Sequence, residues 1–207
     1  MSNNAYASRP RGTLNESRWE EVLTAATAVF AEKGYRSATL RDIAERVGLL
    51  TGSLYYYINS KEELLFEILK RSHLQGLEFV SNDQAVGGSL TPPERLARLI
   101  RNWMGGLQTL PPALRVAEFD FRSLPPDKYA EIEALRRKIS DVPYRIISDG
   151  ISQGYFDSSI DPHIATATLF RILTSTSEWY RPGGHVEWSK VSEFYVRLVV
   201  EGMAIKT

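Results

Sequence analysis

Apolar side chains return every three or four positions through most of the sequence, and this spacing is what most constrains the fold. In residues 17–33 the period is formed by Trp19, Val22, Leu23, Ala26, Val29 and Phe30. Such spacing is typical of an amphipathic helix, which buries one face and leaves the other in water. The same period predicts a helix opening at Ser60 and helices over residues 39–47, 51–57, 91–107, 113–122, 127–153, 162–180 and 188–204.

Capping residues set the expected ends of these helices. Thr39 and Asp42 form an acidic variant of the capping box, residues 60–63 form a second box, and Gly48 stands where a left-handed residue closes a helix. No segment alternates apolar and polar residues between turn signals at hairpin spacing. The predicted fold class is therefore all-α, with about nine helices.

A break in the pattern divides the chain. Residues 82–90 contain two glycines and have no helical period, which indicates a boundary between modules. We therefore expect three parts, namely a flexible basic arm over 1–16, a small domain over 17–81 and a larger domain over 82–207. The arm carries Arg9 and Arg11, which can either reach a minor groove or remain in a solvated tail.

Composition excludes several classes of protein. The sequence contains no cysteine, which excludes disulfide frameworks, thiolate zinc sites, iron–sulfur clusters and cysteine nucleophiles. The three histidines lie on separate predicted elements without the spacing of metal ligands, so we expect no metal and no cofactor. Apolar runs are only a few residues long and the N-terminus lacks a signal-peptide pattern, so we expect a cytoplasmic protein with no membrane partner.

The distribution of charge favours binding to nucleic acid in one segment only. Lys and Arg together number 25, and so do Asp and Glu, so no overall positive field attracts DNA. Residues 33–61 nevertheless carry five basic side chains against two acidic ones. A DNA-binding surface would therefore have to come from the arrangement of charges in this segment.

Two short predicted helices meet at residues 48–50 in a helix-turn-helix pattern, whose second helix can enter the major groove of DNA. The hydroxyl-bearing residues of this second helix are Thr51, Ser53, Tyr55, Tyr56 and Tyr57. Consecutive positions on a helix point in different directions, so at least one of the three tyrosines must face solvent. Hydroxyls suit phosphate oxygens, and the alternative is that Tyr55 and Tyr57 pack in the core of the small domain.

The residues around this pattern resemble the DNA-binding domain of TetR-type (tetracycline-repressor-like) transcriptional regulators. The matching positions are Phe30, Gly34, Tyr35, Thr39, Arg41, Ile43, Ala44, Val47, Gly48, Gly52, Ser53, Leu54, Tyr55, Tyr57, Ser60, Lys61, Glu62 and Leu64. The resemblance implies a homodimer with a helix-turn-helix on each subunit and a C-terminal domain that binds a small effector. The family often has Ser or Thr where Leu50 stands, so we expect the helix cap to move to Thr51.

By position, the resemblance implies that the residues contacting DNA are Thr39, Arg41, Thr51, Gly52, Ser53, Tyr55, Tyr56 and Lys61. Among these, Arg41 and Ser53 are candidates for contacts to the backbone or to base edges. Residues 50–53 and 179–184 also resemble a branch of the family that senses coenzyme A thioesters from steroid or fatty-acid breakdown. The implied partners are operator DNA, a second copy of the chain and a small effector, with an acyl coenzyme A as one candidate.

A polar stripe on a predicted C-terminal helix indicates a binding surface, and Arg171 in this stripe suits an anionic or carbonyl-bearing ligand. The resemblance implies that the helices carrying Trp103 and Phe121 surround a pocket, so the candidate effector-binding residues are Trp103, Phe121, Arg171 and Ser175. The candidate dimer contacts, on the last two long helices, are Ile172, Phe194, Leu198 and Met203. Alternatively, the apolar residues belong to the chain's own core, and the stripe is solvated or forms a salt bridge between subunits.

Together these patterns predict a ligand-responsive transcriptional regulator, expected to be a repressor, that binds a near-palindromic operator as a homodimer and is released by a small effector. An α-helical adaptor without DNA binding is the alternative, but it leaves the hydroxyl-rich helix without a role. Residues 150–154 fit the Gly-x-Ser-x-Gly pattern of a serine hydrolase, yet that pattern requires a strand before the serine. A helix is predicted there, so we expect no enzymatic activity and no catalytic residue.

Overall fold

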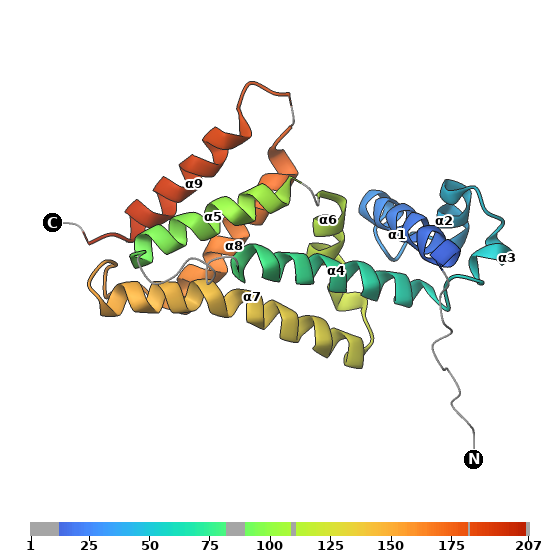
Figure 1. The fold of residues 1–207 in the computed structure, drawn as a ribbon, viewed down its shortest axis with the longest axis horizontal. Coiled ribbons are helices and arrows are strands. Elements are labelled where there is room, and N and C mark those ends of the chain that lie inside the picture. Colours follow the sequence, from blue (N-terminus) through green and yellow to red (C-terminus); the bar gives the residue numbers. More distant parts are fainter. Residues whose placement is uncertain (1–12, 82–89, 109–110, 182, 206–207) are drawn as a thin grey trace, which may run out of the picture.

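The computed structural model describes residues 13–81, 90–108, 111–181 and 183–205, and most of them lie in helices (Figure 1). In chain order the elements are α1 (Thr13–Lys33), α2 (Leu40–Val47), α3 (Thr51–Leu54), α4 (Lys61–Ser81), α5 (Pro92–Leu107), α6 (Pro111–Phe119), the short 3-10 helix η1 (Phe121–Ser123), α7 (Pro126–Ser152), α8 (Pro162–Trp179) and α9 (Trp188–Met203). Within the described ranges, extended pairing is limited to one bridge between Phe156 and Ala204. The predicted all-α class is confirmed.

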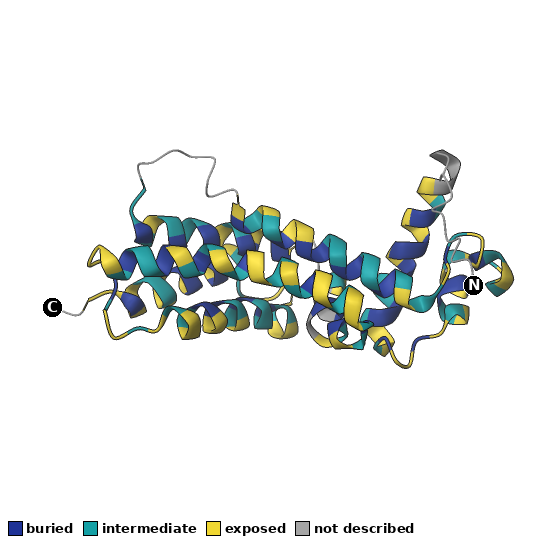
Figure 2. Ribbon diagram, turned by 90° about the horizontal axis from the view of Figure 1, so that it is seen from below, coloured by how far each residue is buried: buried dark blue, intermediate teal, exposed yellow. Residues whose placement is uncertain are grey.

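The molecule is elongated, with α1–α3 at one end and α5, α8 and α9 toward the other (Figure 1). The long helix α4 runs along the middle and packs against α1, α5, α6 and α7. Buried residues follow the inner faces of the helices, and exposed residues follow their outer faces (Figure 2). This is the pattern that the three-and-four spacing of apolar residues predicts.

One core joins α1–α3 to the first half of α4 and to the segment around α6. Its fully buried members include Val22, Ala26, Ile43, Ala44, Leu54, Leu64, Leu65, Leu69, Val116 and Ile132. Val116 lies on α6 and Ile132 on α7, so part of the expected larger domain packs on the smaller one. Residues from both sides of the sequence break at 82–90 therefore share this first core, and the break does not coincide with a boundary of the core.

A second core fills the space between α5, α7, α8 and α9, and takes in the end of α4. Its fully buried members include Val80, Leu96, Leu99, Ile100, Met104, Ile146, Ile147 and Leu173. Two hydrogen bonds add specific links: Trp188 Nε1 donates to the Met104 carbonyl at 3.1 Å, and Thr176 Oγ1 donates to the Tyr195 hydroxyl at 3.0 Å. The helix α9 is therefore fixed to both α5 and α8.

Some helix ends differ from the sequence predictions. The first helix begins at Thr13, four residues before its expected start, so the end of the expected arm is helical, while Arg9 and Arg11 lie outside the described residues. Helix α3 ends at Leu54, and residues 55–57 form a turn, because consecutive aromatic side chains lose rotamer freedom in a helix. The N-cap of α3 is Leu50, which makes no side-chain hydrogen bond, so the expected shift of the cap to Thr51 is wrong.

Candidate functional site

The segment before α3 is held by the hydrogen bonds that begin and end α2. Thr39 Oγ1 accepts a hydrogen bond from the Asp42 N–H at 3.2 Å, and the Asp42 carboxylate accepts one from the Thr39 N–H at 2.9 Å. The same carboxylate accepts a hydrogen bond from Lys33 Nζ at 2.6 Å; this bond and those from Thr39 hold the pKa of Asp42 well below its usual range. At the other end, Gly48 closes α2 with a left-handed φ of 73°. The predicted capping box and glycine cap are confirmed.

The turn after α3 exposes two of the three consecutive tyrosines. Tyr56 exposes 79% of its surface and Tyr55 57%, whereas Tyr57 is half-buried and packs against the core of α1–α3. Leu54 is fully buried and anchors the turn. Tyr57 therefore follows the core alternative, and the hydroxyls of Tyr55 and Tyr56 remain available to a partner.

The other sequence-predicted residues lie around this turn. Thr39, Arg41 and Gly52 are exposed, and Thr51 and Ser53 are half-buried. They gather at the end of the molecule formed by α2 and α3, far from α9 (Figure 1). Arg41 Nε donates to the Glu45 carboxylate at 2.8 Å, but both side chains face water, where such a pair contributes little and exchanges readily. The structure thus brings these predicted residues together on one tip.

Lys61 has a structural partner that the sequence did not indicate. Its Nζ donates to the carbonyl of Tyr35 at 2.8 Å and to the carbonyl of Ala38 at 2.9 Å, and it lies 4.4 Å from the centre of the Tyr35 ring. An ammonium group has three N–H donors, so one remains for another acceptor. Lys61 therefore ties the start of α4 to the loop before α2, which carries Thr39.

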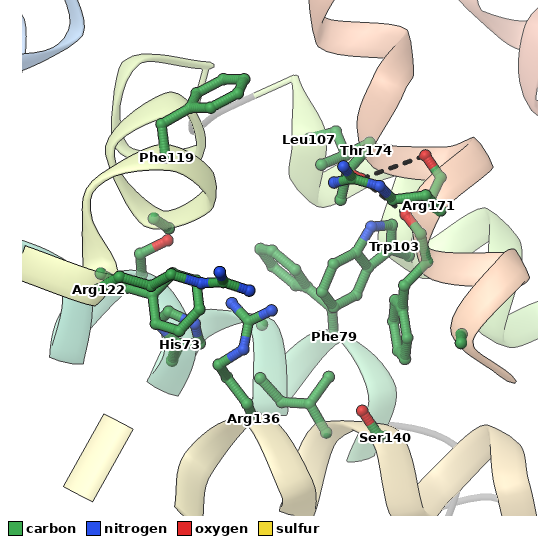
Figure 3. A pocket seen from close by; sticks show the side chains of 17 residues that line it. His73, Phe79, Trp103, Leu107, Phe119, Arg122, Arg136, Ser140, Arg171 and Thr174 are labelled. Carbon is green, nitrogen blue, oxygen red and sulfur yellow. Dashed lines mark hydrogen bonds between the residues drawn. The ribbon is translucent and has the colours of Figure 1, made fainter. Parts of the chain in front are cut away.

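A cavity of about 700 Å³ lies among α4, α5, α6, η1, α7 and α8 (Figure 3). Of the four predicted effector-binding residues, Trp103, Phe121 and Arg171 line it. Ser175 is not among the lining residues, and its Oγ donates to the Ile172 carbonyl at 2.9 Å along its own helix. Its neighbour Thr174 lines the cavity instead.

Sequence reasoning missed several lining residues. Arg122 on η1, Arg136 on α7, and His73 and Phe79 on α4 all line the cavity, and none of them was predicted (Figure 3). His73 is 7% exposed, and its Nδ1 lies 2.7 Å from the Leu69 carbonyl oxygen, so the neutral ring donates from Nδ1. Burial lowers the pKa of His73 to about 4. The ring is therefore neutral near pH 7, which leaves Nε2 as an acceptor.

One hydrogen bond joins the wall of the cavity to the α1–α3 end of the molecule. The Asp120 carboxylate accepts a hydrogen bond from the Tyr35 N–H at 3.2 Å, across 85 positions of sequence. Asp120 directly precedes Phe121 and Arg122, which line the cavity. Burial raises the pKa of Asp120. A displacement of η1 would therefore act directly on the loop between α1 and α2.

The predicted dimer contacts fall into two groups. Phe194 exposes 60% of its surface and Leu198 51%, and they lie one turn apart on α9. Ile172 is half-buried and packs against the second core. Met203 is 9% exposed and belongs to that same core. Only the first two therefore present large apolar surfaces outward, and Met203 follows the alternative of intrachain packing.

The Gly-x-Ser-x-Gly pattern lies at the end of α7. Ser152 is the last residue of α7, and its Oγ donates to the Asp149 carbonyl at 2.9 Å, so a helix and not a strand precedes this serine. In the part of the chain that the structure describes, no group of three or more His, Asp or Glu residues is placed to hold a metal ion. None of the described helices combines the length and apolar character that crossing a bilayer requires.

Comparison with known proteins gives two family matches. The family described as "Tetracyclin repressor-like, C-terminal domain" matches residues 89–203, and the family described as "Bacterial regulatory proteins, tetR family" matches residues 22–68. The second match contains α2, α3 and the tyrosine turn. The first contains most of the cavity wall and α9.

Relatives and solved structures agree with these matches. The transcriptional repressor KstR2 of Rhodococcus jostii is 31% identical over 192 residues, which cover 90% of this chain and 91% of the relative. KstR2 of Mycobacterium tuberculosis is 31% identical over 200 residues, which cover 94% of this chain and 96% of the relative. The solved structure of that protein superposes with a TM-score of 0.78 over 91% of this chain and 96% of the solved chain. These names point to a transcriptional regulator. The chain belongs to the TetR family of bacterial transcriptional regulators.

Proposed function

We propose that the chain is a repressor that binds a near-palindromic operator as a homodimer and leaves it when a small effector occupies the cavity. Regulators of this family bind operator DNA, typically as dimers, and respond to small molecules. The observation that carries the proposal is the outward-facing turn after α3, where two neighbouring tyrosines lie in solvent. Each of these side chains offers an apolar ring and a hydroxyl to a partner.

The proposed DNA contacts use the hydroxyls and charges around this turn. Helix α3 enters the major groove, and Gly52 lets its backbone approach the duplex. The proposed contacts are Thr39, Arg41, Thr51, Gly52, Ser53, Tyr55, Tyr56 and Lys61. Arg41 would exchange Glu45 for a phosphate, and Lys61 would use its remaining N–H. Most of these contacts address the phosphate backbone, so they position the helix more than they select a sequence.

Dimerisation is proposed through α8 and α9 of each subunit. The exposed side chains of Phe194 and Leu198 supply apolar surface, and Ile172 extends the proposed seam. A symmetric pair would set two recognition helices about 34 Å apart, which matches half-sites one turn of DNA apart. The distance between the two recognition helices is therefore the quantity that an effector would change.

We propose that the effector acts through α4 and η1. Helix α4 carries His73 and Phe79 on the cavity wall and begins at Lys61 beside the loop before α2. The Asp120–Tyr35 hydrogen bond offers a second connection from η1. An effector shifts the equilibrium only if it binds the released arrangement more tightly than the DNA-bound one.

For the effector itself, we propose an acyl coenzyme A thioester from steroid or fatty-acid breakdown. The support for coenzyme A is the resemblance of residues 50–53 and 179–184 to a branch of the family that senses such thioesters. The support for steroid breakdown is the likeness to the KstR2 repressors, one of which is described as a ketosteroid transcriptional regulator. Detection of a co-purified small molecule by native mass spectrometry tests this part directly. A co-purified molecule without coenzyme A would contradict it and leave the DNA-binding proposal intact.

A salt titration tests the DNA-binding proposal. We expect the affinity for random duplex DNA to fall linearly on a logarithmic scale as salt rises, because bound phosphates release their counterions. Tyr56→Ala should weaken binding, whereas Tyr155→Ala, at another exposed tyrosine outside the site, should not. Absence of salt-dependent binding, as an adaptor protein predicts, would refute the proposal.

A further inference from the structure

The cavity has an uneven balance of charge. Three arginines, Arg122, Arg136 and Arg171, line it, and among its described lining residues there is no aspartate and no glutamate. The chain as a whole carries equal numbers of basic and acidic side chains. Three arginines with no acidic residue among the described lining residues are therefore a local feature that the average composition does not explain.

Arg122 and Arg136 form a pair around one aromatic ring. The guanidinium carbon of Arg136 lies 4.4 Å from the centre of the Phe121 ring, and that of Arg122 lies 5.6 Å from it. They come from η1 and α7 and reach toward the same part of the cavity (Figure 3). Neither has an ion pair with a described residue. Phe121 thus holds two like charges near each other, which costs free energy unless an anion joins them.

The environment of Arg136 makes this lack of an anion more costly. The side chain is half-buried, and its burial lowers the pKa of Arg136. A guanidinium nevertheless remains charged at any physiological pH. Glu133, one turn earlier on the same helix, attracts the charge of Arg136 and also interacts with the Tyr129 hydroxyl, but it is not among the residues that line the cavity. Arg122 lies at the exposed side of the cavity, so a ligand can reach the pair from solvent.

Part of the remaining wall is aromatic. The Trp103 ring packs edge-on against Phe79 at 6.4 Å and against Phe170 at 4.8 Å between ring centres. Trp103 is 7% exposed, and its indole N–H is buried without a partner among the described residues. A buried donor without an acceptor is costly, and a bound ligand can supply that acceptor. This wall suits a flat or branched apolar body with a polar atom on it.

We infer that the cavity binds an amphipathic organic anion, whose oxyanion lies between Arg122 and Arg136 and whose apolar body lies against Phe79, Trp103 and Phe170. The inference rests on the proposed function only in taking this cavity as the effector site. The oxyanion is a carboxylate or a phosphate, because both match the two-pronged geometry of guanidinium groups. Arg122 and Arg136 are thereby the residues that select for negative charge.

A matched pair of dyes tests the inference without knowledge of the natural effector. 1-Anilinonaphthalene-8-sulfonate carries a sulfonate, and N-phenyl-1-naphthylamine has the same rings without it. We expect the wild-type chain to bind the sulfonate dye at least about tenfold more tightly, which is the size of one charge-assisted hydrogen bond. Arg122→Met and Arg136→Met should each reduce that preference, and the double variant should abolish it.

The control is Arg137→Met, because Arg137 neighbours Arg136 on α7 but is exposed and does not line the cavity. It should leave the preference unchanged. Arg122 is itself exposed, so Arg122→Met remains a valid test if the substitution of half-buried Arg136 impairs folding. Equal affinity of the wild-type chain for both dyes, or an unchanged preference in Arg122→Met, would overturn the inference.

Competition titrations then decide whether the bound oxyanion is a carboxylate or a phosphate. Displacement of the sulfonate dye by dodecanoate assigns a carboxylate, and displacement by dodecyl phosphate assigns a phosphate. Displacement by neutral dodecanol as readily as by either anion would count against the arginine pair. These titrations contain no DNA, so a failure of charge selection is distinguishable from a failure of operator binding, which the salt titration measures separately.

Discussion

Protonation of His73 should destabilise the folded chain as the pH falls. This side chain is buried in the cavity wall on α4, and its burial lowers its pKa from 6.5 to about 4, with Arg136 adding to the effect and the hydrogen bond to the Leu69 carbonyl opposing it. The unfolded chain binds this proton near pH 6.5, but the folded chain binds it only near pH 4. The stabilising contribution is therefore complete above pH 6.5 and is lost as the pH falls toward 4.

The size of the effect follows from the difference between the two pKa values. A shift of one pKa unit corresponds to about 1.4 kcal/mol, so the full shift corresponds to about 3 kcal/mol. At about pH 4.5 most of this is already lost, and we expect His73 alone to lower the free energy of unfolding by about 2.5 kcal/mol relative to about pH 7.5.

Urea unfolding at these two pH values, at one fixed protein concentration, measures the effect. His73→Leu removes the titrating group, so its loss of stability between the two pH values should be smaller than that of the wild type by about 2.5 kcal/mol. The hydrogen bond to Leu69 is absent from the variant at both pH values and so cancels in the comparison. His185→Gln, at an exposed histidine, should behave as the wild type. Equal losses in the wild type and His73→Leu would refute the reasoning.

Two further substitutions follow from close contacts. A Cβ on Gly106 would lie 2.1 Å from the Phe79 ring, so Gly106→Ala should push that ring toward the cavity and weaken dye binding, whereas Gly105→Ala, with nothing within 4 Å, should not. Fluorescence titration of the sulfonate dye decides between them. Asp120→Ala leaves the Tyr35 N–H without its acceptor and should lower the unfolding free energy by about 1 to 2 kcal/mol in the same urea assay. An unchanged midpoint would show that this bond adds nothing.

Local features of the fold were predictable because neighbouring residues decide them. The capping bonds of Thr39 and Asp42 involve residues three positions apart, and Gly48 closes α2 through its own backbone conformation. The predicted end of the helix over residues 51–57 was wrong. Helix α3 stops at Leu54, because the aromatic residues that follow it do not continue the helix. The exposure of Tyr56 was predictable from the directions of consecutive side chains, but the packing of Tyr57 required the core around it.

The cavity could be predicted only in part, because it forms where six elements meet. The family resemblance pointed to Trp103, and the polar stripe pointed to Arg171. The stripe also selected Ser175, whereas its neighbour Thr174 lines the cavity, since one residue turns a helix by about 100°. Nothing in the sequence signalled that Arg122 and Arg136 would meet at one aromatic ring, because η1 and α7 approach through tertiary packing.

The same limit applies to the proposed dimer surface. Helical spacing placed Leu198 and Met203 together as apolar residues of one helix, yet the structure exposes the first and buries the second. A buried face within one chain and a face buried between two chains have the same sequence pattern. Periodicity alone therefore could not assign either residue to the seam.

Photocrosslinking at position 56 tests the central claim, that the turn after α3 lies against duplex DNA, most directly. The chain would carry p-benzoylphenylalanine in place of Tyr56 and would be bound to an operator selected from a random pool. We expect crosslinks to both half-sites of that operator, since each subunit presents one turn, and we expect none from the same probe in place of Tyr155. Operator binding without a crosslink from position 56, or with equal crosslinking from position 155, would contradict the claim.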